Sequence, residues 1–246
     1  MATATYKINR FHPSELPDTG VIMFVGRSGS GKTFAMRDII YSKRHFDTAL
    51  GIFGSEDTSA DFRGILPDLF IHDKWDEKIM EEIYNKQERD VRLGRAKKLL
   101  LIVDDMMHSK NLLKSSKTMQ RIFFSGRHAR ILLLLTMQYC KSMPPDLRQQ
   151  VGFTFLTYEK LIGNRKRIFD TFNNVFDSFT EFDGVMKAIT PDFTILVLSN
   201  VFNTSDDISK NVFWYKAKQR KAYKIGKNGP MWKVQQRLYD NMYFIR

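Results

Sequence analysis

The chain has 246 residues, of which 43% are hydrophobic and 27% charged, so it can bury a core without disulfides and is neither disordered nor fibrous. The single Cys140 cannot form an internal disulfide, which favours a reducing compartment. The most apolar run, Ile131 to Met137, is too short to cross a bilayer, and the first ten residues lack the apolar core of a secretory signal. We therefore expect a soluble, intracellular protein.

The formal net charge of +12 and a pI near 9.7 indicate a surface that attracts polyanions, of which nucleic acid is the most abundant. The alternative is a charge excess that only aids solubility. Basic residues concentrate between positions 214 and 229, interleaved with Trp214, Tyr215 and Tyr223. This pattern suits phosphate contact and base stacking, although a solvated β-hairpin would look similar.

The first twenty residues, with three Pro or Gly positions, are expected to be an irregular lead-in. After it, apolar runs that end at glycine or polar residues predict strands, and apolar residues near helical spacing predict helices. In chain order these elements are a strand over 21–26, a helix over 32–44, a strand over 48–54, a helix over 76–91, a strand over 98–105, a helix over 117–126, strands over 130–138 and 151–158, a helix over 160–177 and a strand over 193–200.

Strands separated by helical stretches predict an α/β fold with a mainly parallel central sheet flanked by helices. No linker or internal repeat divides the sequence. We expect one ATPase-type domain over 21–205, followed by a small basic C-terminal appendage over 206–246 that packs on the domain or continues it.

The segment between the first strand and the first helix reads GRSGSGKT, a full match to the phosphate-loop pattern G-x-x-x-x-G-K-[S/T]. Its glycines let the backbone turn tightly and aim N–H groups at phosphate oxygens, and the helix N-terminus adds partial positive charge. Lys32 is predicted to reach the β- and γ-phosphates of ATP, and Thr33 to place its hydroxyl on Mg²⁺. The predicted nucleotide-binding residues are Gly26, Arg27, Ser28, Gly29, Ser30, Gly31, Lys32 and Thr33.

Two acids, Asp104 and Asp105, end the buried strand over 98–105, at the sheet edge where ligands bind in α/β folds. Asp104 is predicted to hold Mg²⁺ through its water shell. Asp105 is predicted to polarise the attacking water, as the second acid does in ATPases with an extra strand between the two motifs. Many such enzymes carry glutamate there, so the shorter Asp105 needs an intervening water to reach.

Further candidates follow the strand over 130–138. Gln138 at its end could sense the γ-phosphate or orient water, or could be a simple strand terminus. Arg148, after Pro144 and Pro145, and Arg127 are candidates for an arginine finger, a role often supplied by a neighbouring subunit; a surface position is the alternative for each.

Together, GRSGSGKT, LLLIVDD and the stretch from Gly126 to Leu156 resemble the genome-packaging ATPases of large DNA viruses and virophages, in the FtsK/HerA group of P-loop motors. The resemblance covers about residues 21–200. It implies a RecA-like ASCE fold, with the strand of Gln138 between the phosphate-loop strand and the acid strand. It also implies Gln138 as the sensor, and Arg148 or Arg127 as the finger.

The function implied by this resemblance is the translocation of double-stranded DNA into a preformed capsid by a ring of five or six subunits, with a capsid or portal vertex as partner. Such a protein would work in the host cytoplasm, at the virus factory, and could enter the virion. Two alternatives remain open: a nucleoside or small-molecule kinase, which shares the phosphate loop, and a morphogenesis protein that uses ATP only as a switch.

Overall fold

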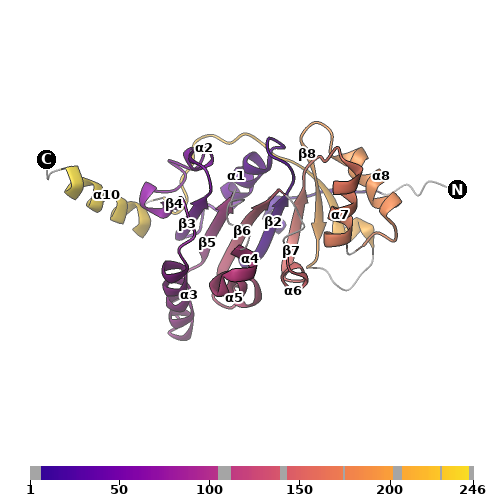
Figure 1. Cartoon of the computed structure of the whole chain (residues 1–246). Coiled ribbons are helices and arrows are strands. Elements are labelled where there is room, and N and C mark those ends of the chain that lie inside the picture. The colour runs from indigo at the N-terminus through magenta and orange to yellow at the C-terminus, as the bar shows by residue number, and fades with distance from the viewer. Residues whose placement is uncertain are drawn as a thin grey trace.

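A computed structural model describes residues 7–104, 112–138, 143–173, 175–201, 207–227 and 229–243. In these residues a nine-stranded sheet has the order β1-β9-β8-β7-β2-β6-β5-β3-β4 (Figure 1). The strands are β1 (Asn9–Arg10), β2 (Gly20–Val25), β3 (Thr48–Phe53), β4 (Ile71–His72), β5 (Leu99–Asp104), β6 (Ile131–Met137), β7 (Val151–Leu156), β8 (Thr194–Ser199) and β9 (Val212–Lys216).

Helices connect these strands. They are α1 (Lys32–Ser42), α2 (Glu56–Ala60), α3 (Glu77–Arg92), α4 (Leu112–Ser115), α5 (Lys117–Ser125), α6 (Pro145–Arg148), α7 (Ile162–Phe172), α8 (Phe179–Ile189), α9 (Ile208–Asn211) and α10 (Pro230–Tyr243), with 3₁₀ turns η1 (Pro13–Glu15) and η2 (Asp68–Phe70). Each predicted strand is present within a residue or two of its expected bounds. The predicted α/β class with a mainly parallel sheet is confirmed.

Among the described strands, β8 alone runs opposite to the rest, and it pairs antiparallel with both β7 and β9. The helix predicted over 160–177 is present as α7, but it ends earlier, at Phe172, and a second helix that was not predicted, α8, begins at Phe179. The Ser178 side chain caps α8 by accepting from the Glu181 N–H at 3.3 Å, and the Glu181 carboxylate accepts from the Asp177 N–H at 3.0 Å. The second helix returns the chain to the edge where β7 ends, so β8 must run the opposite way.

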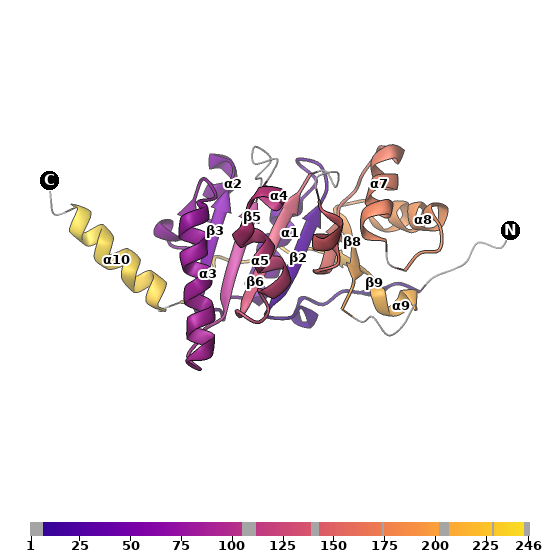
Figure 2. The same cartoon turned by 60° about the horizontal axis from the view of Figure 1, so that its bottom comes forward.

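The strands are buried on both faces, as expected for parallel strands between helical layers. One face packs against α3 to α8, and the other against α1, the N-terminal lead-in and the segment after β9. Figure 2 shows α3 and α5 in front of the sheet and α1 behind it. The lead-in is not purely irregular, because Phe11 is buried among Phe153, Phe155 and Phe213 after β1 joins β9.

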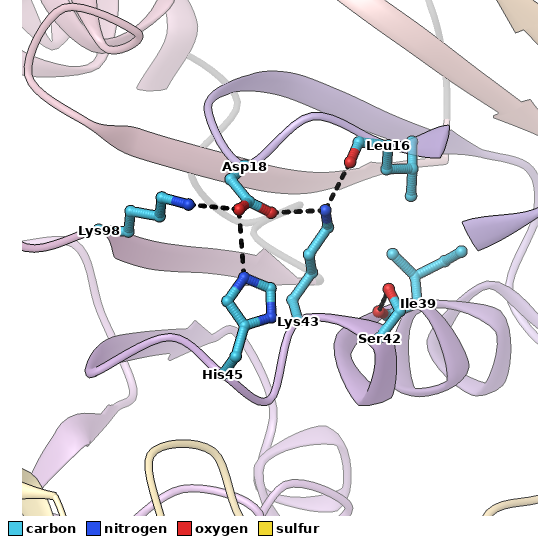
Figure 3. Close-up of polar contacts among 7 residues, drawn as sticks. All are labelled: Leu16, Asp18, Ile39, Ser42, Lys43, His45 and Lys98. Carbon is cyan, nitrogen blue, oxygen red and sulfur yellow. Dashed lines mark hydrogen bonds and ion pairs between the residues drawn. The ribbon is translucent and has the colours of Figure 1, made fainter. Parts of the chain in front are cut away.

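A polar cluster ties the lead-in to the edge of the sheet where the parallel strands begin (Figure 3). Asp18 accepts from Lys43 Nζ at 2.7 Å, from Lys98 Nζ at 2.5 Å and from His45 Nε2 at 3.2 Å. Partial burial would raise the pKa of Asp18, but the hydrogen bonds from these three side chains outweigh it and hold the pKa well below its ordinary value. The cluster therefore fastens the C-terminal end of α1 to the start of β5.

Residues 217–227, which we call the strap, leave β9 and cross over α1 toward β3 (Figure 1). Ile225 is fully buried, and its N–H donates to the Ile65 carbonyl at 3.1 Å. The Gly226 N–H donates to the Arg44 carbonyl at 3.0 Å, and a β-carbon there would lie 3.0 Å from the Phe46 carbonyl oxygen. Beyond the strap, α10 extends away from the rest of the molecule past β4 (Figures 1 and 2).

Candidate functional site

The phosphate loop lies between β2 and α1, at the edge where the parallel strands end. It starts from a fixed base, because the Gly26 N–H donates to the Met137 carbonyl at 3.0 Å. Gly29 and Gly31 have φ of 72° and 88°, which side-chain-bearing residues rarely adopt, so glycine is required at both positions. Lys32 is 8% exposed, and its Nζ donates to the Arg27 carbonyl at 2.7 Å, so the ammonium group lies against the loop.

The loop is closely fitted to the end of β7. The hydroxyl of Thr157 lies 2.7 Å from Ser30 Oγ, and Ser30 Oγ donates to the Arg27 carbonyl at 2.7 Å. A β-carbon at Gly26 would lie only 1.8 Å from Thr157 Oγ1. The first glycine of the motif is therefore set by the approach of β7 rather than by a ligand.

Asp104, 2% exposed at the end of β5, is held by two hydroxyl groups from different elements. Thr33 Oγ1 donates to its Oδ2 at 3.0 Å, and Thr136 Oγ1 on β6 donates to its Oδ1. Two residues that are 71 positions apart, one from the phosphate loop and one from the acidic strand end, thus meet.

The sequence places Thr136 with Gln138 at this edge of the sheet, but the hydrogen bond from Thr136 to Asp104 was not predicted. The position of Thr136 follows from the strand register, since Val103 pairs with Leu135 and the next residues are Asp104 and Thr136. The polar side chain within the apolar run 131–137 is the signal in the sequence, and the register supplies its partner.

Gln138 directly follows β6, next to Met137, whose carbonyl accepts from the first residue of the phosphate loop. The strand order β2-β6-β5 places this strand between the phosphate-loop strand and the acid strand. Gln138 therefore leaves the sheet between the end of β2, where the phosphate loop begins, and the end of β5, where Asp104 lies. The second acid, Asp105, lies outside the described residues.

The residues present fit a magnesium nucleotide. The Thr33 hydroxyl and the Asp104 carboxylate are the oxygen ligands that Mg²⁺ prefers, either directly or through its water. The left-handed glycines and the start of α1 provide backbone N–H groups for phosphate oxygens. The metal ion and the phosphates of such a ligand therefore both have matching groups at this edge of the sheet.

The two candidate finger arginines lie at the other edge. Arg127 precedes β6, and the carbonyl of Arg130, three residues later, accepts from the Leu99 N–H at the start of β5. Arg148 ends α6 just before β7, and its Nε donates to the Met143 carbonyl at 3.2 Å. Neither is brought near the phosphate loop of its own chain, because β6 and β7 begin at this edge and end at the loop.

The aromatic residues of the basic segment are packed into the fold rather than displayed. Tyr215 is buried, and its hydroxyl donates to Asp38 of α1; burial, then this hydrogen bond, raises its pKa. Tyr223 donates to the Arg37 carbonyl at 2.6 Å. Asp38 also accepts from the Lys218 N–H at 2.7 Å and from Arg220 at 2.5 Å. The interpretation of these tyrosines as base-stacking platforms was wrong, because Tyr215 attaches β9 to α1 and Tyr223 attaches the strap to α1.

The lysines of this region remain on the surface. Lys216, Lys218, Lys221, Lys224 and Lys227 are exposed. In the part of the chain that the structure describes, none of the five forms an ion pair with a carboxylate. The strap, with four of these lysines, therefore carries exposed positive charge that no carboxylate among the described residues neutralises.

The sequence profile of the NB-ARC domain matches residues 8–158, more than half of the chain and the whole stretch from the lead-in to Thr157. The chain belongs to the NB-ARC family. As an NB-ARC protein it is a P-loop NTPase, and its phosphate loop, Asp104 and Gln138 all fall within the matched residues.

Proteins of large DNA viruses are similar in sequence to this chain over most of its length. The uncharacterized protein 088R of Invertebrate iridescent virus 3 is 31% identical over 198 residues, covering 80% of this chain and 75% of the relative. The uncharacterized protein L437 of Acanthamoeba polyphaga mimivirus is 29% identical over 209 residues, covering 81% and 73%. The chain thus also belongs to a family of viral proteins.

Solved structures share the fold at low identity. The genome packaging NTPase B204 of Sulfolobus turreted icosahedral virus 2, in complex with ATP-gammaS, has a TM-score of 0.58 and 15% identity, covering 83% of this chain and 100% of B204. ATPases 2 and 3 of EssC from Geobacillus thermodenitrificans have a TM-score of 0.56 and 13% identity, covering 95% and 46%. Among the described helices, none is long and apolar enough to span a bilayer.

Proposed function

We propose that this protein is an ATP-driven motor that translocates double-stranded DNA into a preformed viral capsid. The observation that carries the proposal is the insertion of β6, with Gln138 at its end, between the phosphate-loop strand and the strand of Asp104. This arrangement is typical of ATPases that activate water, and it disfavours the kinase alternative. The fold shared with B204, a genome packaging NTPase, and the viral relatives support the packaging role.

The proposed site residues divide the work of hydrolysis. Lys32 binds the β- and γ-phosphates, and the backbone of residues 26–31 donates to their oxygens. Thr33 and Asp104 would hold Mg²⁺, which neutralises charge on the phosphates. Asp105 polarises the attacking water, and Gln138, next to the loop, orients it or senses the γ-phosphate.

The position of the arginines supports a ring-shaped homo-oligomer. Arg127 and Arg148 lie at the edge of the sheet opposite the phosphate loop, so a finger from either must reach the site of a neighbouring subunit. The Arg148→Ala variant, which lacks the finger, should recover some ATP turnover when it is mixed with Lys32→Ala subunits. The Lys32→Ala subunits supply the finger, and the Arg148→Ala subunits supply an intact phosphate loop. Absence of recovery at any mixing ratio would exclude Arg148 as a finger in trans.

The partner that fits the surface is DNA. The net charge of +12 and the exposed lysines of the strap provide phosphate contacts without base recognition. A packaging motor must move DNA of any sequence, so contacts of this kind suffice. Binding should weaken steeply with salt, because it is driven by release of counterions from the DNA phosphates.

The deciding experiment is an ATPase assay with and without double-stranded DNA, with the oligomer sized in the same buffer. We expect DNA to raise the rate, and Lys32→Ala to abolish the rate while leaving the fold intact. Activity that ignores DNA but needs a nucleoside acceptor would favour the kinase. Nucleotide binding without hydrolysis would favour the ATP-switched morphogenesis protein.

A further inference from the structure

A strained turn stands at the mouth of the phosphate loop. Because β8 runs antiparallel to β7, its first residue, Thr194, lies at the edge where β7 and β2 end. The Thr194 N–H donates to the Pro191 carbonyl at 3.1 Å, which closes a four-residue turn. Its central residues, Asp192 and Phe193, have φ of 54° and 57°, as in a type I′ turn that normally carries Asn-Gly.

The second central position is the strained one, because a bulky side chain is disfavoured in the left-handed region where glycine is the usual occupant. Phe193 is also 72% exposed, the largest exposed fraction of the large hydrophobic residues described. Among the residues that the structure describes, no other aromatic side chain stacks on its ring. Packing within the fold therefore does not explain why phenylalanine stands there.

The ring lies beside the phosphate loop. A β-carbon built on Gly31 would lie 3.4 Å from Phe193 Cδ1, and Gly31 is the residue that precedes Lys32 and caps α1. In the strand order β8-β7-β2-β6-β5, the turn stands on the side of the loop away from Asp104 and Gln138. A metal held by Thr33 and Asp104 would draw the phosphates toward the acid side of the loop, which would leave the nucleoside on the side of the turn.

We propose that Phe193 stacks on the nucleobase of the bound nucleotide. This rests on the proposed function only in that the loop holds a nucleotide; it does not depend on DNA or on hydrolysis. Stacking on an aromatic ring tolerates any base, because every base has a π-face. Phe193 therefore adds affinity for the nucleoside part, with little choice between adenine and guanine.

The test is calorimetric binding of ADP and of inorganic pyrophosphate, each with Mg²⁺, to the full chain. Phe193→Gly removes the ring and relieves the strained φ, so this variant should melt at or above the temperature of the native chain. We expect it to bind ADP about tenfold more weakly and pyrophosphate equally well, since stacking on one base contributes about tenfold or more. Phe193→Trp should restore ADP affinity and add a fluorescence signal that ADP quenches.

Phe124→Ala is the matched control, because Phe124 is an exposed aromatic residue at 44% on α5, on the other face of the sheet. It should leave both affinities unchanged. ADP affinity within twofold of native in Phe193→Gly would overturn the stacking role, as would an equal loss of pyrophosphate affinity, which would mean that the turn shapes the loop. Failure of the native chain to bind either ligand would instead refute the nucleotide site itself.

Discussion

Replacing Thr136 by valine tests how the metal-binding acid is held. Valine keeps the shape of threonine, so the change removes one hydroxyl and leaves packing between β5 and β6 intact. Thr136 is 7% exposed, and the Asp104 carboxylate it bonds is 2% exposed, so water cannot easily replace the donor. A hydrogen bond to an ionised acceptor contributes about 1.5–3 kcal/mol, so we expect the free energy of unfolding to fall by about 2 kcal/mol.

For a chain of this length that loss corresponds to a Tm lower by about 4–8 °C. The same change releases Asp104 on one side, and loss of a partner that orients a metal ligand costs about 10–100-fold in metal affinity. The Mg²⁺ concentration for half-maximal ATP hydrolysis should therefore rise at least about tenfold. The assays are thermal melting without nucleotide and a Mg²⁺ titration of turnover.

Thr136→Ser is the control, since serine keeps the hydroxyl, and it should preserve the Mg²⁺ dependence. If Thr136→Val melts within about 1 °C of the native chain and has the same Mg²⁺ dependence, the hydroxyl does not hold Asp104 and the reasoning fails.

Three further changes test the surroundings of the site. Gly26→Ala would place a β-carbon 1.8 Å from Thr157 Oγ1, so nucleotide binding and Tm should both drop; adding Thr157→Ala should recover part of the Tm, and no recovery would show that the contact is not the cause. Asp38→Asn should speed proteolysis within residues 217–227, because the strap loses the charge that accepts three hydrogen bonds; an unchanged cleavage pattern would contradict this. Asp18→Asn should lower the free energy of unfolding at pH 7 by about 2 kcal/mol. Since the pKa of Asp18 is lowered on folding, that difference should narrow as the pH falls below about 4, and a constant difference in urea unfolding from pH 7 to 3 would refute the role of the carboxylate.

Much of the site could be predicted because its signals are local. Glycines in the phosphate loop report backbone geometry directly, and the apolar runs before Asp104 and Gln138 report buried strands whose ends must meet at one edge. The neighbourhood of Thr33 and Asp104 follows from those two facts.

The rest depends on chain direction and on contacts between distant residues, which a single sequence does not encode in any local pattern. The reversal at β8 required recognising the start of a second helix at Ser178, and it alone brings Phe193 beside Gly31. Tyr215 on β9 donates to Asp38, 177 positions away, so an aromatic residue in a basic segment looked like part of a binding surface when it serves packing.

Helix α1 connects the parts of the molecule that the proposed function needs to act together. Its first residues, Lys32 and Thr33, belong to the nucleotide site, and its buried Asp38 holds the strap that carries the exposed lysines. Just beyond its end, Lys43 is fixed through Asp18 to the edge where β5 begins. The nucleotide site and the lysine-bearing strap are therefore both attached to the same helix, α1. In the proposed motor, Asp38 would be the link through which a shift of α1 at the phosphate loop reaches the strap.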